Sequence, residues 1–160
     1  MVYTNVDKTD FYQSMLGQVE AIIAGENDTI ANMANISAIL FNAFDGVNWA
    51  GFYRLIDNEL VLGPFQGQVA CIRIPVGRGV CGTAVSEKRI QLIADVHQFE
   101  GHIACDAASN SEIVIPVYHQ NKVIAVLDID SVSFGYFDQE DAKGLQAIVH
   151  AFEQQMTVSS

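Results

Sequence analysis

The sequence predicts an α+β fold, in which helices cover a central, largely antiparallel sheet of about six strands. Two observations predict it. Apolar residues recur at helical spacing through the first 44 residues and again from residue 137 onward. Between these segments the apolar residues alternate or form short runs, separated by Gly, Asn and Asp turn signals. Helices at both ends of a strand-rich middle are typical of a sheet with helices packed on it.

Two helices are expected in the N-terminal part. The first spans residues 7–24 and ends at Gly25. Asp28 is placed to cap the second, which spans residues 30–44. An Asp-Gly turn then leads into the strands.

Six strands and two further helices follow. The strands are expected at residues 47–56, 59–62, 71–75, 90–94, 112–118 and 123–129. A helix at residues 80–87 interrupts the series, and a loop at residues 95–111 precedes the last two strands. A helix at residues 137–156 closes the chain, with Asp138 as its expected N-cap. No internal repeat or linker is visible, so a single domain covering residues 1–160 is expected.

Composition and charge exclude several classes of protein. The chain is 50% hydrophobic and 17% charged, which is typical of a globular protein rather than a disordered one. Its net charge of −11 opposes nucleic acid and anionic membrane surfaces as partners. No apolar run approaches the ~20 residues of a membrane span, and the N-terminus lacks the pattern of a secretory signal. We therefore expect a cytoplasmic protein, whose disulfides would be transient and catalytic.

Three cysteines, Cys71, Cys81 and Cys105, lie beside loop-forming Gly and Asn residues rather than inside apolar runs. A single cysteine is more often a small buried core residue than a reactive one. Loops, however, carry chemistry more often than core packing, and an odd number of cysteines argues against a closed framework of structural disulfides. Two thiols that can meet, close to carboxylates, favour thiol redox chemistry on a small polar substrate.

The three thiols differ in their expected reactivity. Cys81 falls in the first turn of a predicted helix, where the helix dipole favours a thiolate. Cys105 precedes Asp106, whose charge disfavours a thiolate, although His102 could offset it. Cys71 opens a predicted strand and is the least activated. Local chemistry alone therefore favours Cys81 as the nucleophile.

Carboxylates gather at the end of the last predicted strand. Side chains alternate across a strand, so Asp128 and Asp130 share one face. That face is also expected to hold Ile124 and Val126, and the opposite face Val123, Ala125, Leu127 and Ile129. Each aspartate alone is best explained as a turn carboxylate satisfied by backbone N–H groups of Ser131 and Ser133. Together with Glu112, which opens the neighbouring strand, they favour a site, because buried carboxylates repel one another unless a cation or a proton joins them.

Aromatic residues on the first predicted strand offer a second wall for such a site. Trp49, Gly51 and Tyr53 share one face of residues 47–56. Ordinary core packing explains the two aromatic side chains as well as a pocket wall does.

A metal site is the competing use of the polar residues. Its ligands would come from Cys71, Cys81, Cys105, His97 and His102. Their spacing lacks the paired C-x₂-C or H-x₃-H arrangement of structural zinc sites, so no metal and no cofactor are expected.

Three segments of the chain resemble the GAF-fold free methionine-(R)-sulfoxide reductases. They read GPFQGQVACIRIPVGRGVCGTA (63–84), ADVHQFEGHIACDAASNSEIVIPV (94–117) and VLDIDS (126–131). The resemblance extends from NWAGFY (48–53) to the last helix, and all three cysteines lie in the contexts typical of the family. It departs at Glu100, where a proline is usual, and at Gln68, where a lysine is common. The resemblance implies a GAF-like sandwich with the N- and C-terminal helices on one face of the sheet.

The resemblance also implies roles for particular residues. In the family the cysteine of the HIACD motif attacks, which corresponds to Cys105. Cys71 would then resolve it, and Cys81 would be a helper or an alternative partner. The residues that match the family's substrate carboxylates and pocket aromatics are Glu112, Asp128, Asp130, Trp49 and Tyr53.

The implied reaction is the reduction of free methionine (R)-sulfoxide to methionine. A thiolate attacks the sulfoxide sulfur, a neutral carboxylic acid supplies a proton, and the remaining negative charge holds the substrate ammonium. A cysteine sulfenic acid and then a disulfide follow, and thioredoxin or a similar dithiol reduces the disulfide.

A non-enzymatic GAF sensor that binds a small molecule is the main alternative, and a redox-switch protein that uses Cys81 is a weaker one. Many GAF domains only bind, but sensors normally adjoin an output domain, for which we expect no room in this chain. A homodimer through the terminal helices is a further expectation, because GAF domains often pair in this way.

Overall fold

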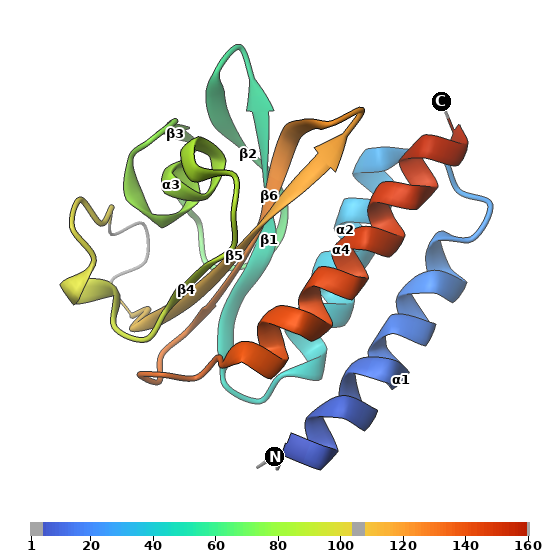
Figure 1. The fold of residues 1–160 in the computed structure, drawn as a ribbon, viewed down its shortest axis with the longest axis horizontal. Helices are drawn as coiled ribbons and strands as arrows, with labels where there is room; N and C mark the ends of the chain where they lie inside the picture. The colour runs from blue at the N-terminus through green and yellow to red at the C-terminus, as the bar shows by residue number, and fades with distance from the viewer. Residues whose placement is uncertain (1–4, 104–107, 160) are drawn as a thin grey trace.

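A six-stranded sheet with the strand order β3-β2-β1-β6-β5-β4 forms the centre of the computed structural model, and every neighbouring pair is antiparallel (Figure 1). The structure describes residues 5–103 and 108–159. The elements in chain order are α1 (Asn5–Ile23), α2 (Thr29–Ala43), β1 (Val47–Ile56), β2 (Glu59–Gly67), β3 (Arg73–Pro75), α3 (Gly79–Glu87), β4 (Gln91–Ile93), a short 3₁₀ helix (Val96–Gln98), β5 (Ser111–His119), β6 (Lys122–Ser131) and α4 (Gln139–Ser159). The predicted α+β fold is confirmed.

The two faces of the sheet are covered differently. α2 packs on β1 and β2, α4 packs on β5, and α1 lies outside them against α2 and α4, as Figure 1 shows. Their apolar side chains bury one face of the sheet, including Phe52, Ile115 and Leu127. α3 packs on the opposite face of β5 and β6, over a second cluster that contains Tyr53 and Val126. The second face is therefore covered by α3 and not by the terminal helices.

The predicted helix caps are confirmed. Oδ1 of Asp28 accepts a hydrogen bond of 2.9 Å from the backbone N–H of Ala31 at the start of α2. Oδ1 of Asp138 accepts from the N–H groups of Glu140 and Asp141 at 3.0 and 3.2 Å, and Oδ2 of Asp141 accepts from the N–H of Asp138 at 2.8 Å. This reciprocal pair satisfies N–H groups of α4 that have no partner inside the helix.

The second strand is longer than its predicted range of residues 59–62. Gly63 and Pro64 suggest a turn, but β2 continues past them to Gly67. A shift of register between Gly51 and Tyr53 accommodates the irregular stretch. Gly51 has no side chain, and a Cβ at that position would overlap Phe65 of β2. The close approach of the two strands therefore requires glycine at this position.

The alternation predicted along β6 is correct from Ala125 onward and wrong before it. Val123 packs with the α3 side of the sheet and Ile124 with the α2 and α4 side, the reverse of the prediction. The cause is a β-bulge: Val117 pairs with Ala125, but Tyr118 pairs with Val123, so that Ile124 is the extra residue. An extra residue in one strand shifts the alternation by one position.

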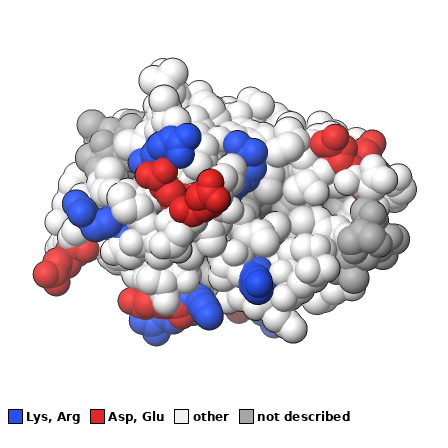
Figure 2. Space-filling view, turned by 90° about the horizontal axis from the view of Figure 1, so that it is seen from above, with Lys and Arg blue, Asp and Glu red and all other residues white. Residues whose placement is uncertain are grey.

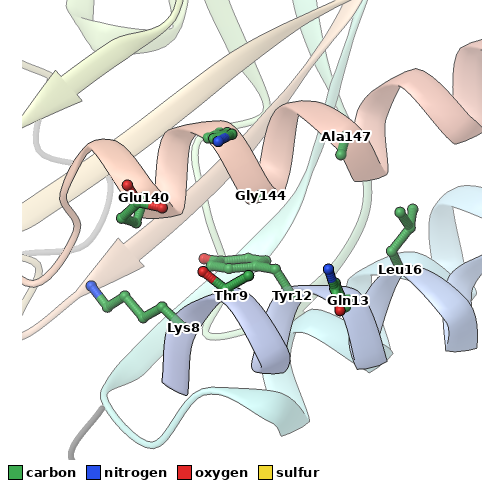
Figure 3. A pocket seen from close by; sticks show the side chains of 9 residues that line it. Lys8, Thr9, Tyr12, Gln13, Leu16, Glu140, Gly144 and Ala147 are labelled. Carbon is green, nitrogen blue, oxygen red and sulfur yellow. The ribbon is translucent and has the colours of Figure 1, made fainter. Parts of the chain in front are cut away.

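α1 is fastened to α4 by a polar cluster and a close ring contact. The hydroxyl of Tyr12 donates to Oδ1 of Asp141 at 2.7 Å, and Nζ of Lys8 lies 2.9 Å from carboxylate oxygens of both Asp138 and Asp141. Figure 3 shows the ring of Tyr12 facing Gly144 of α4. Both residues line a cavity of about 240 Å³ between the two helices. A Cβ at Gly144 would overlap this ring, so glycine permits the close approach.

Charged groups are interspersed on the surface. Figure 2 shows one face, on which Lys, Arg, Asp and Glu are mixed among larger uncharged areas. Among the described residues, the helices are too short or too polar to cross a bilayer.

Candidate active site

A small cavity of about 40 Å³ lies on the face of the sheet that α3 covers. Residues from five parts of the chain line it: Tyr53, Ile74, Gly79, Val80, Cys81, His102, Ile103, Ser109, Glu112, Asp128 and Asp130. Five of the predicted site residues are among them, namely Cys81, Tyr53 and the three carboxylates. The cavity therefore brings together residues that are far apart in the sequence.

The strand register explains why the carboxylates converge. β5, β6 and β1 are neighbours in the sheet, and Glu112 lies directly opposite Asp130. Asp128 lies one pleat further along β6, opposite Gly51 of β1. Side chains two residues apart on a strand share a face, and directly opposed residues are within contact distance. The predicted clustering of Glu112, Asp128 and Asp130 is therefore seen in the structure.

Burial makes this cluster electrostatically unusual. The three carboxylates are each 5–8% exposed. Burial, followed by the charges of Asp130 and Glu112, raises the pKa of Asp128 well above its ordinary value. Within the described part of the chain, Oδ1 of Asp128 has no hydrogen-bond partner. The predicted alternative of a turn carboxylate is not supported for Ser133, whose N–H donates to Oγ of Ser131 at 3.1 Å. Asp128 is therefore a buried carboxyl group that holds its proton to a higher pH than an ordinary aspartate does.

Cys81 lies against the carboxylates and not in a thiolate-stabilising site. Its thiol is free and buried, and Sγ lies 3.9 Å from Oε2 of Glu112. Burial, then the charges of Asp128, Glu112 and Asp130, raise the pKa of this thiol well above its ordinary value. The expectation that the start of α3 favours a thiolate here is wrong, because burial and nearby negative charge outweigh the partial charge of a helix end.

Cys71 is in contact with Tyr53 through its backbone. It is half-buried, precedes β3, and is disulfide-bonded. The hydroxyl of Tyr53 donates to the carbonyl oxygen of Cys71 at 2.9 Å. Burial, followed by the charge of Asp128, raises the pKa of Tyr53, so its hydroxyl stays protonated and available as a donor. Tyr53 thus contacts both the cavity and the segment that carries Cys71.

Cys105, the predicted nucleophile, lies in residues 104–107, outside the described residues. The described residues on both sides of this segment, His102, Ile103 and Ser109, line the cavity. The sequence indicated His102 only as a neighbour of Cys105 and a candidate metal ligand, and it did not indicate Ile103 or Ser109. All three lie within the quoted segment 94–117, which is the signal that could have identified them.

The predicted aromatic residues have different positions. Tyr53 lines the cavity, whereas Trp49 is buried behind it and is not among the lining residues. The Trp49 ring stacks on Tyr53 at 5.9 Å and on Phe65 at 5.1 Å between ring centroids. The indole N–H donates to the carbonyl oxygen of Gln68 at 3.1 Å. Trp49 therefore supports the cavity wall rather than forming it.

The start of α3 forms another part of the wall. Gly79 lines the cavity and has a φ of 65°, a conformation that favours glycine. The N-cap residue Arg78 makes no side-chain capping hydrogen bond to this helix. Helix N-termini of this kind attract anionic groups through their backbone N–H groups.

One group of residues in the described chain has the geometry to hold a metal ion. The ligand atoms of Cys81, Glu112 and Asp128 all lie within 4.8 Å of one another. This set differs from the cysteine and histidine ligands considered from the sequence. His97, which belongs to that earlier set, instead has Nε2 bonded to Oδ1 of Asn110 at 2.8 Å.

Comparison with known proteins gives consistent results. Residues 33–154 match the GAF domain family. The chain is 56% identical over 149 residues to the free methionine-R-sulfoxide reductase of Escherichia coli, covering 93% of this chain and 90% of that protein.

Two solved structures are also closely similar. The structure of fRMsr of Staphylococcus aureus in complex with substrate has a TM-score of 0.88 and 52% identity, covering 91% of this chain and 95% of that one. The free methionine-R-sulfoxide reductase of Neisseria meningitidis, in complex with its substrate, has a TM-score of 0.92 and 41% identity, covering 99% of this chain and 95% of that one.

Proposed function

Because the chain belongs to the GAF-fold free methionine-(R)-sulfoxide reductases, a family of oxidoreductases, we propose that it reduces free methionine (R)-sulfoxide to methionine by thiol chemistry. The observation that carries this proposal is the buried cluster of Glu112, Asp128 and Asp130 at a cavity bordered by both ends of the segment that contains Cys105. Such a cluster is unfavourable unless a cation or a proton neutralises it. In the proposed reaction, the cation is the substrate's ammonium group and the proton is the one transferred to the sulfoxide oxygen.

The substrate's ammonium group is the cation in this proposal. Ionised carboxylates of the cluster hold it, while the N–H groups at the start of α3, near Gly79, hold the α-carboxylate. A methionine inside a peptide chain has neither charge. This arrangement therefore accounts for selectivity for the free amino acid.

The thiol of Cys105 is the nucleophile. Its thiolate attacks the sulfoxide sulfur, and Asp128 delivers a proton to the sulfoxide oxygen. Methionine leaves, and Cys105 retains the oxygen as a sulfenic acid. The thiol of Cys71 then attacks this sulfur, water is released, and a disulfide forms. The disulfide-bonded state of Cys71 and the free thiol of Cys81 support this division of roles.

An external protein dithiol, thioredoxin or a similar reductant in the cytoplasm, completes the cycle by thiol–disulfide exchange. The raised pKa of Cys81 supports a secondary role for this thiol, because a protonated thiol is a weak nucleophile.

The test is the loss of free methionine sulfoxide in the presence of dithiothreitol, with the R and S epimers assayed separately. We expect turnover of the R epimer only. No turnover of either epimer would contradict the proposal and favour a binding-only sensor.

Single-turnover measurements on the reduced protein separate the cysteines. Cys105→Ser should abolish the first turnover. Cys71→Ser should retain the first turnover but fail to form the disulfide. Cys81→Ser should reduce activity the least of the three. An inactive Cys81→Ser together with an active Cys105→Ser would reverse the assignment.

A further inference from the structure

We propose that Val69 and Ile72, the exposed apolar side chains that flank Cys71, form the docking surface for the protein dithiol that reduces the disulfide of Cys71. We call these two side chains the Val69/Ile72 rim. The inference rests on the proposed function, since it requires a disulfide that is reduced in every catalytic cycle.

The rim is unusual in its exposure. Val69 is 86% exposed and Ile72 is 67% exposed, more than any other large hydrophobic side chain in the described residues. Exposed apolar side chains that adjoin a reactive group commonly mark an interaction site, whereas isolated ones elsewhere need no explanation. Here both lie within two residues of the same disulfide-bonded cysteine.

The backbone of the rim is held in place. The indole N–H of Trp49 bonds the carbonyl oxygen of Gln68 at 3.1 Å, and the Tyr53 hydroxyl bonds that of Cys71 at 2.9 Å. The N–H of Leu62 bonds the carbonyl oxygen of Ile72 at 2.8 Å. These three bonds fix the segment, so its apolar side chains stay exposed instead of folding inward. A surface that is already ordered loses less conformational entropy on binding.

The local charge also favours approach at this point. The chain carries a net charge of −11, whereas residues 60–86 contain Arg73 and Arg78 and no carboxylate; Arg73 is ion-paired with Glu59 at 2.9 Å, so Arg78 supplies the net positive charge of this region. An incoming thiolate is therefore repelled less here than at the acidic remainder of the surface. The partner that fits is a protein whose reactive dithiol is surrounded by uncharged, apolar surface.

The partner reduces the disulfide of Cys71 in two thiol–disulfide exchange steps. A thiolate of the partner attacks Sγ of Cys71 and forms a mixed disulfide, while the sulfur previously bonded to Cys71 leaves as a thiolate and takes up a proton. The partner's second thiol then attacks the sulfur of the partner's first cysteine, which is bonded to Cys71 in the mixed disulfide. Cys71 is released as a thiol, and the partner is left oxidised.

The first experiment compares two reductants on the same variants. Val69→Ser, Ile72→Ser and the double variant are assayed with dithiothreitol, and with thioredoxin, thioredoxin reductase and NADPH. We expect the double variant to raise the KM for thioredoxin about tenfold, because the apolar contact area is lost. Its kcat/KM for the sulfoxide with dithiothreitol should not change. Ile22→Ser, which removes an exposed apolar side chain from α1, is the matched control and should change neither.

The second experiment does not depend on turnover. A thioredoxin whose second active-site cysteine is replaced by serine is mixed with the oxidised protein, and the trapped complex is mapped by mass spectrometry. The expected link is to Cys71, with a lower yield for the double variant. An unchanged thioredoxin KM, or a link to a different cysteine, would overturn the docking surface. Absence of dithiothreitol-dependent activity in the unmodified protein would instead refute the proposed function.

Discussion

Asp128 connects the stability of the protein with its chemistry. Burial, followed by the charges of Asp130 and Glu112, raises the pKa of Asp128, so the folded protein holds this proton to a higher pH than the unfolded chain does. A carboxyl whose pKa is raised on folding destabilises the folded state increasingly as pH rises above its unfolded value. In the proposed mechanism, the same proton is transferred to the sulfoxide oxygen. A catalytic advantage is thus obtained at the expense of stability.

Replacing Asp128 with Asn should therefore separate the two effects. We expect Asp128→Asn to raise the melting temperature at neutral pH, since an amide needs no proton, and to slow single-turnover reduction by about 10²–10⁴-fold. Melting curves and quenched single-turnover assays measure the two quantities. A variant that is less stable but fully active would contradict the assignment of Asp128.

The pH dependence of the single-turnover rate also tests the role of Asp128. In the unmodified protein, the single-turnover rate should fall on the alkaline side as Asp128 loses its proton, even though a thiolate becomes more abundant there. This alkaline decline should be absent in Asp128→Asn. Single-turnover rates measured across the full pH range in which the protein stays folded test for this alkaline decline.

Blocking the substrate's ammonium group tests the carboxylate cluster as a whole. N-acetyl methionine sulfoxide should be a much poorer substrate than the free amino acid, because its uncharged nitrogen leaves buried carboxylates without their partner. The loss of one such contact typically costs about 2–5 kcal/mol, or roughly 30-fold and more in kcat/KM. Equal kcat/KM values for the two compounds would show that the cluster of Glu112, Asp128 and Asp130 does not bind the ammonium group.

At the residue level, the sequence predicts which side chains meet better than it predicts their environment. Alternation along the last strand places Asp128 and Asp130 on one face, and the position of Glu112 at the start of the neighbouring strand adds it to them. The thiol of Cys81 was assigned the opposite tendency, because the sequence shows the start of a helix but not the carboxylates of β5 and β6 opposite it. Proximity follows from local periodicity, whereas a pKa depends on the surroundings that the whole fold creates.

The contact between α1 and α4 depends on a position without a side chain. Gly144 faces the ring of Tyr12 (Figure 3), and a Cβ there would overlap it. Gly144→Ala should destabilise the protein by about 1–3 kcal/mol, although alanine is the better helix former, because the two helices must move apart. Thermal unfolding should show a melting temperature roughly 3–10 °C lower.

Gly17 of α1 provides the control. It is exposed and has no atom of another segment near its would-be Cβ. Gly17→Ala should therefore stabilise the protein by about 0.5–1 kcal/mol through helix propensity alone. Equal effects of the two substitutions would mean that the ring contact does not determine the spacing of the helices.

The elements themselves were largely predictable, and the exceptions share one cause. The helices and their caps at Asp28 and Asp138 follow from periodicity and local hydrogen bonding. The extension of β2 through Pro64 and the bulge at Ile124 do not, because each depends on the strand that lies beside it. Irregularities that are set by a neighbouring strand leave no mark in the local sequence.

At the scale of the whole molecule, the disulfide of Cys71 should not be needed for folding. The apolar clusters on both faces of the sheet supply the core, and the half-buried Cys71 lies at the margin of the second cluster. The protein treated with dithiothreitol should keep its far-UV circular dichroism spectrum and a cooperative melting transition. Unfolding on reduction would show that the cysteines are structural, contrary to the proposed cycle.

The homodimer expected from the sequence stays a prediction.

The contacts of Tyr53 have a thermodynamic consequence. One end of this side chain lines the cavity and its hydroxyl holds the carbonyl oxygen of Cys71, so cavity occupancy and the state of the thiols share a common element. If the oxidised and reduced proteins bind the sulfoxide with different affinities, linkage requires that the ligand shift the midpoint potential of the thiol couple by the same free energy. The concentration of the amino acid would then help to set how readily the enzyme accepts electrons.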